Sequence, residues 1–218
     1  DKEKTDSRLA MQNKDFRQAI NFAFDRHAYA AQTNGEDGAD RILRNTVTPS
    51  NFVQIGGKNF GDAVNEKMVN YGTEWSNINL NDAQAAFLDP EKAKAEFAKA
   101  KDSLQAEGVT FPIHLDMLVD QTAKLDVQQA SSFKQTVEAT LGSDNVVIDI
   151  IQLSPDEKDN ATFFADTADQ KDYDIDISGW SGDFSDPKTY LDLLDPDSGS
   201  QLKNLGLTPG KDNDVKEK

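Results

Sequence analysis

The sequence contains no cysteine, only two histidines, and no apolar run long enough to span a lipid bilayer. The absence of cysteine excludes disulfide bonds, thiolate metal sites and a cysteine nucleophile. Neither G-x-x-x-x-G-K-[ST] nor G-x-G-x-x-G occurs in the chain, which disfavours a nucleotide-driven enzyme. These absences leave few residues for covalent or metal-assisted catalysis.

Positive charge is also scarce, because 23 lysines and arginines face 39 aspartates and glutamates, for a net charge of -16. Nucleic acids and anionic membrane surfaces would repel such a chain at long range, so neither is an expected partner. With 218 residues, 37% of them hydrophobic, the chain is long enough for one or two domains with a hydrophobic core.

Both ends of the chain are polar. The start, DKEKTDSR, has neither an initiator methionine nor the apolar core of a signal peptide, and the end reads KDNDVKEK. We therefore expect a piece excised from a longer chain, with an irregular lead-in over 1–14 and a flexible tail over 196–218.

The first regular element is predicted in DFRQAINFAFDRHAY, where apolar residues recur at helical spacing. This spacing predicts one core-facing helix over 15–33, with His27 on its inner face. The segment 34–88 is rich in Gly, Asn, Thr and Ser, and we expect a long loop excursion with few regular elements. A loop of this length suggests a functional role, such as lining a ligand cleft.

The pattern of helix and strand signals over 89–195 predicts a βαβαβ core. Asp89-Pro90-Glu91 is a helix start, and Gly108 ends the helix. Apolar runs at 111–119 and 146–153 have strand length, and the helical pattern at 122–141 between them is long enough for a right-handed crossover. The two strands should therefore be parallel, which makes the fold class α/β with a parallel-rich sheet and flanking helices.

The stretch Tyr173 to Tyr190, YDIDISGWSGDFSDPKTY, follows this core. It begins with the alternation of a strand, bends between Gly179 and Gly182, and reaches a helix start at Asp186-Pro187. Ligands of open α/β sheets bind at the carboxyl ends of the strands, so the loop should project its side chains there. The candidate ligand-binding residues are Trp180, Ser181, Gly182, Asp183 and Phe184.

The run GWSGDFSDPKTYL resembles the extracellular solute-binding proteins that capture oligopeptides for ATP-driven importers, in the peptide/nickel-binding family. DFRQAINFAFDR is similar to the family's "RQAL…AIDR" helix, and DPEKAKAEFAKA follows its pattern too. Within the family, the chain is most similar to the Ami and Ali group of streptococcal lipoproteins.

The resemblance implies the second lobe of a two-lobed, periplasmic-binding-protein-like fold at 15–195. It implies a monomer that binds oligopeptides and delivers them to a membrane permease, without catalysis and without a cofactor. It also implies that Asp183 pairs with the α-amino group of the peptide, and that the complete protein is lipid-anchored on the extracellular face of the cell membrane. Peptide length, and a peptide rather than nickel, haem or sugar as the ligand, stay open.

One alternative is a hydrolase acting through a serine or through paired carboxylates. Ser131 and Lys134 fit S-x-x-K, and Ser143-Asp144-Asn145 spells S-D-N, but both lie around one helix end and no K-T-G follows. The loop after Tyr173 lacks the last glycine of G-x-S-x-G. His27 and His114 fall at positions where packing is the expected role.

A second alternative is a calcium-dependent adhesion module, because aspartates are dense from Asp172 to Asp197. Asp195-Pro196-Asp197-Ser198-Gly199 resembles the opening of a calcium loop. However, the loop contains a proline, and Gly206 stands where an EF-hand has its glutamate. A solvated acidic surface accounts for these residues better.

Overall fold

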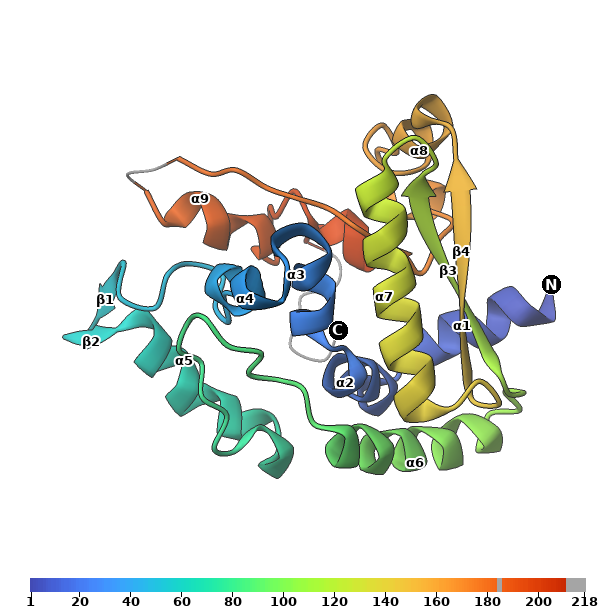
Figure 1. Cartoon of the computed structure of the whole chain (residues 1–218), viewed down its shortest axis with the longest axis horizontal. Helices are drawn as coiled ribbons and strands as arrows, with labels where there is room; N and C mark the ends of the chain where they lie inside the picture. The colour runs from blue at the N-terminus through green and yellow to red at the C-terminus, as the bar shows by residue number, and fades with distance from the viewer. Residues whose placement is uncertain (184–185, 211–218) are drawn as a thin grey trace.

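The computed structural model of the chain describes residues 1–183 and 186–210 (Figure 1). The α-helices in this part are α1 (Lys2–Gln12), α2 (Lys14–Ala23), α3 (Arg26–Asn34), α4 (Glu36–Ala39), α5 (Phe60–Met68), α6 (Pro90–Ala106), α7 (Lys124–Leu141), α8 (Pro155–Ala161) and α9 (Lys188–Leu191). The 3-10 helices are η1 (Asp40–Ile42), η2 (Val69–Tyr71), η3 (Thr73–Trp75), η4 (Ala168–Gln170), η5 (Asp192–Leu194) and η6 (Leu202–Leu205). The strands are β1 (Gln54–Ile55), β2 (Lys58–Asn59), β3 (Ile113–Asp120), β4 (Val146–Leu153) and β5 (Ile175–Asp176).

The main sheet has the strand order β4-β3-β5, and both pairings are parallel. β3 and β4 pair along their whole length, from Ile113 opposite Val146 to Asp120 opposite Leu153, with α7 as the crossover. The predicted α/β class and the parallel pairing of the first two strands are confirmed. The third strand is shorter than its sequence pattern suggests, because only Ile175 and Asp176 pair with β3.

One hydrophobic cluster joins the sheet to the helices around it. Phe16 and Phe22 of α2, Leu104 of α6, and Leu115 and Ile148 of the sheet are fully buried in it. α7 packs on β3 and β4, and α2 packs on α6. Figure 1 shows the sheet and α7 on one side of the molecule and the elements of the 34–88 excursion on the other. Burial of this apolar surface holds the two sides together.

The expected lead-in over 1–14 is wrong, because residues 2–12 form the helix α1. Asp1 caps this helix by accepting a hydrogen bond from the backbone N–H of Lys4, at 3.0 Å. Asp6, Ser7 and Ala10 are buried, and α1 contacts β3. The sequence of α1 has few large apolar residues, so its helical pattern is weak, and tertiary contacts stabilise it.

The expected continuous helix over 15–33 is also wrong, because it breaks between α2 and α3. Phe24 and Asp25 have extended backbone angles, with ψ values of 111° and 94°. The Asp25 side chain accepts a hydrogen bond from the backbone N–H of Ala28, at 3.0 Å, and so begins a new helix. Aspartate competes in this way with the helical backbone, while the apolar spacing continues across the break.

Two further segments differ from the expectation. The excursion over 34–88 contains the helix α5 and a small antiparallel hairpin, β1–β2. Part of the expected flexible tail is packed, because Leu202 is fully buried, Leu207 is 4% exposed, and Lys203 donates to the backbone carbonyl of Ala165 at 3.1 Å. The rest of that tail, 211–218, lies outside the described residues.

Within residues 1–183 and 186–210, each helix is too short or too polar to cross a bilayer.

Candidate functional site

The candidate loop leaves β5 and runs to α9. Figure 1 shows this segment extending away from the sheet toward α9, instead of remaining at the carboxyl edge of the sheet. The predicted order of strand, loop and helix is correct, but the helix begins one residue later than expected, with Pro187 at the N-cap. Asp186 forms the turn before it by accepting a hydrogen bond from the backbone N–H of Lys188, at 2.9 Å. The loop's position, by contrast, is set by its contacts with α9.

The loop displays its candidate side chains on the surface. Trp180 is 54% exposed, and Ser181 and Asp183 are exposed as well. Phe184 lies outside the described residues. An exposed indole and an exposed carboxylate on one loop could contact a ligand that carries an apolar group and a cation. Their role in ligand contact stays a prediction.

Gly182 is half-buried against α9. A Cβ atom at this position would lie 2.5 Å from the hydroxyl oxygen of Thr189 and 2.6 Å from a ring carbon of Tyr190. The next residue, Asp183, donates its backbone N–H to the Thr189 hydroxyl at 3.0 Å. Glycine therefore serves this loop through close approach to the helix.

The start of the loop is held by an ion pair. Asp176, the last residue of β5, pairs with Lys158 of α8, and both side chains are largely buried. The nearby Lys171 has its pKa lowered by burial and by the charge of Lys203. The ammonium group of Lys171 lies 5.8 Å from the ring centre of Tyr173. These contacts fix the point from which the loop departs.

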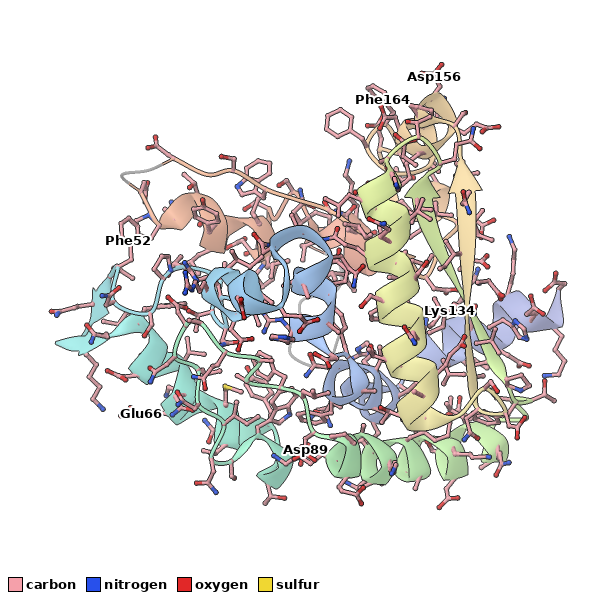
Figure 2. The ribbon with its side chains drawn as sticks, viewed as in Figure 1. Phe52, Glu66, Asp89, Lys134, Asp156 and Phe164 are labelled. Atoms are coloured by element: carbon pink, nitrogen blue, oxygen red, sulfur yellow. The ribbon has the colours of Figure 1, made fainter. Side chains whose placement is uncertain are left out.

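An exposed aromatic pair, Phe163 and Phe164, is not among the residues predicted from the sequence. Their side chains are 75% and 61% exposed, and their rings pack edge to face with centres 5.1 Å apart. Figure 2 shows Phe164 beside α8, at the end of the molecule where β3 and β4 finish. Exposed apolar surface of this kind is available for binding. Two adjacent aromatic residues just after a helix could have indicated this exposed surface, because both rings cannot pack into the core together.

The two histidines are not packed in the core as expected. The His27 ring nitrogens lie 2.7 Å from an Asp40 carboxylate oxygen and 2.9 Å from one of Glu36. Hydrogen bonding to Asp40 first, and then to Glu36, raises the pKa of His27 to about 9. The turn from α3 to α4 and η1 brings these carboxylates to the ring, which the helical spacing alone does not reveal.

His114 forms a similar contact across the sheet, with Nδ1 2.7 Å from a carboxylate oxygen of Asp149 on β4. Its side chain is about one third exposed. The serine proposed for hydrolysis, Ser131, donates its hydroxyl to the backbone carbonyl of Val127 within α7, at 2.8 Å. Neither histidine is its partner.

Lys134 completes the S-x-x-K pattern but faces elsewhere. Its ammonium group donates to Glu138 at 2.7 Å and to the backbone carbonyl of Ile148 at 2.6 Å. Figure 2 shows Lys134 on α7, with β4 beside that helix. The lysine therefore ties α7 to β4, and it is not placed to activate Ser131.

The acidic segment proposed for calcium forms a turn. One carboxylate oxygen of Asp195 accepts hydrogen bonds from the backbone N–H groups of Asp197 and Ser198 and from the Ser198 hydroxyl, at 2.9 to 3.0 Å. These bonds lower the pKa of Asp195. In the described part of the chain, no three histidine or acidic side chains converge to hold a metal ion.

A separate cavity of about 390 Å³ lies between α2 and the segment from α5 to η3. Gln18 lines it and accepts a hydrogen bond from the Trp75 indole N–H at 2.8 Å, while its amide donates to the buried Glu96 at 2.9 Å. None of the described candidate residues, 180–183, lines this cavity. These hydrogen bonds join α2 to η3 and to α6 beside the cavity.

The relatives of this chain are oligopeptide-binding proteins. It is 58% identical to the oligopeptide-binding protein AliB of Streptococcus pneumoniae and 52% identical to the oligopeptide-binding protein SarA of Streptococcus gordonii. Each alignment covers 98% of this chain, but only 33% of AliB and 32% of SarA. The chain thus spans about a third of the length of these relatives.

Solved structures with the same fold have lower sequence identity. The crystal structure of a peptide-binding protein of a peptide ABC transporter matches with a TM-score of 0.58 at 24% identity, over 93% of this chain and 72% of that chain. OppA of Listeria monocytogenes bound to peptide matches with a TM-score of 0.57 at 20% identity, over 93% of this chain and 33% of that one.

The model of the family described as bacterial extracellular solute-binding proteins, family 5, middle, matches residues 4–201. The match covers most of the chain, including the sheet and the loop between β5 and α9. This chain therefore belongs to the family 5 bacterial extracellular solute-binding proteins.

Proposed function

We propose that this chain is one lobe of an oligopeptide-binding protein that supplies an ATP-driven importer. The observation that carries the proposal is the 58% identity to an oligopeptide-binding protein along 98% of the chain. The exposed Trp180 and Asp183 on the loop after β5 fit this role, because the family resemblance assigns the aspartate to the peptide's amino terminus.

In this proposal the peptide lies extended between two lobes. Its backbone amides and carbonyls meet hydrogen-bonding groups of the protein, and its side chains enter wide, hydrated pockets. Backbone recognition of this kind gives affinity with little dependence on peptide sequence. The carboxylate of Asp183 contributes a charge-assisted contact with the α-amino group, which is common to all peptides with a free amino terminus.

The whole protein acts as a monomer at the extracellular face of the cell membrane, held there by a lipid anchor, and delivers peptides to a membrane permease. It binds its ligand without chemical conversion. Ser131 and Lys134 support this, since the Ser131 hydroxyl donates to Val127 within α7 and Lys134 donates to Ile148 of β4.

Ligand capture by the full-length protein tests the proposal. Protein purified without denaturation should carry short peptides, which mass spectrometry of the released ligands would detect. Calorimetry with a pool of random-sequence hexapeptides should then show binding after those ligands are removed. Recovery of nickel, haem or a sugar, with no affinity for the hexapeptide pool, would contradict the proposed ligand class.

The hydrolase alternative has a simple assay of its own. Reporter esters and peptides incubated with the full-length protein should show no turnover. Hydrolysis that is abolished by Ser131→Ala would support the alternative and overturn the proposal that this protein only binds.

A further inference from the structure

We propose that Thr189 is a positioning residue for Asp183 and thereby determines how strongly the protein recognises the amino terminus of a peptide. This inference rests on the proposed function, and it adds a residue that need not touch the peptide. It follows from the contacts between the loop and helix α9.

The Thr189 hydroxyl has its hydrogen-bonding direction fixed. It donates to the backbone carbonyl of Asp186 at 2.9 Å, and it accepts the backbone N–H of Asp183 at 3.0 Å. Because the single hydroxyl proton is used toward Asp186, a lone pair is directed at Asp183. The helix thus holds the backbone of the residue that carries the candidate carboxylate.

The close approach of Gly182 is a second, independent sign of this attachment. The space between Gly182 and α9 is too small for a methyl group, since a Cβ atom at this position would lie within 2.6 Å of both Thr189 and Tyr190. The loop therefore contacts the helix at two successive residues. Gly182 packs closely against the helix, and the backbone N–H of Asp183 is hydrogen-bonded to it.

This attachment matters because Asp183 is exposed. An exposed carboxylate on an untethered loop samples many positions, and binding a cation then requires the loop to become ordered. Thr189 removes part of that ordering cost before the peptide arrives. A peptide with an acetylated amino terminus makes no ion pair with Asp183, so its affinity should not depend on Thr189.

The test compares Thr189→Val, Thr189→Ser and wild type in the full-length protein. Calorimetry would use a random-sequence hexapeptide pool with free amino termini and the same pool after N-acetylation. We expect Thr189→Val to weaken binding of the free-amine pool about three- to tenfold, to leave the acetylated pool unchanged, and to be rescued by Thr189→Ser, which restores the hydroxyl.

Thr136 of α7 offers a matched control. Its hydroxyl also accepts a backbone N–H, that of Asp25 at 3.4 Å, and also donates to a backbone carbonyl, that of Phe133 at 3.2 Å. Thr136→Val removes the same type of bond far along the chain from the loop. It should leave the ratio of affinities for free and acetylated peptides at its wild-type value.

A double-variant cycle separates positioning from general damage. In an Asp183→Asn background, Thr189→Val should cause no additional loss for free-amine peptides, because the carboxylate that it positions is already gone. Equal losses for free and acetylated peptides, or additive losses in the cycle, would overturn the positioning role while peptide binding itself stands. A wild-type protein that binds neither pool would overturn the proposed function as well, which is a distinguishable result.

Discussion

Asp6 and Thr110 are joined by two hydrogen bonds that connect the first helix to the chain just before β3. One oxygen of the Asp6 carboxylate accepts the Thr110 hydroxyl at 2.7 Å and the Thr110 backbone N–H at 3.2 Å. The same carboxylate pairs with Lys2 at 2.8 Å. Hydrogen bonding from Lys2, and then from Thr110, lowers the pKa of Asp6. These bonds attach α1 to the sheet.

We predict that Asp6→Ala destabilises the chain by about 1–3 kcal/mol, because it removes a buried carboxylate that accepts hydrogen bonds from Lys2 and Thr110. Urea unfolding of the 218-residue chain would measure this. Asp102→Ala is a suitable control, since Asp102 is exposed on α6. Equal stability of the two variants would show that α1 contributes nothing to the fold through Asp6.

The His27 contacts predict a pH dependence of stability. Both ring nitrogens face carboxylates, and the pKa of His27 is raised to about 9, above its ordinary value of 6.5. Folding therefore favours the protonated ring, and the stabilisation is fully present below pH 6.5 and declines as the pH rises toward 9.

The measurement is the melting temperature of wild type and His27→Gln between pH 6 and 9.5. The advantage of wild type should be largest at the acidic end of this range and should vanish near its alkaline end. A difference that stays constant across the range would show that the imidazolium form is not the one held by Asp40 and Glu36.

We predict that Asp183→Asn in the full-length protein weakens peptide binding by about 1–3 kcal/mol, the usual scale for a hydrogen bond to a charged group. The loss should shrink for peptides with a blocked amino terminus, which calorimetry with both peptide forms would detect. Equal losses for the two forms would show that Asp183 does not receive the amino group.

The 218-residue chain alone should bind peptides no more tightly than about millimolar, although it should fold around its own core. Ligand sites of this kind enclose roughly 70–90% of a small ligand, and one lobe supplies only part of that surface. Exposed ion pairs contribute only about 0–1 kcal/mol because water screens them. Calorimetry of the chain with the free-amine hexapeptide pool decides this, and micromolar affinity would mean that one lobe contains the complete site.

Elements with local signals can be predicted from the amino-acid sequence. Asp89 begins α6 because its side chain accepts the backbone N–H of Lys92, three residues away, at 3.0 Å. Ser154 begins α8 through a capping box with Glu157, also three residues away. The two long strands were predictable from their apolar runs, and their parallel pairing from the length of the crossover between them.

Features that depend on contacts between distant residues cannot be predicted in this way. The helix α1 is held by Asp6 through Thr110, 104 residues further along the chain. Leu202 is buried although its surroundings in the sequence are polar. In both cases the stabilising contact joins residues far apart in the sequence, so that neither local propensity nor periodicity records it.

The candidate site divides in the same way. The glycines, the indole and the carboxylate of the loop could be identified from the sequence, and so could the helix that follows it. The contacts of Gly182 and Asp183 with Thr189 could not be predicted from the sequence, because they depend on where the loop crosses the surface of α9. The residue types of the loop determine which chemistry it can offer. Packing against α9 determines where the carboxylate is held, because a short loop takes its conformation from the elements that it contacts.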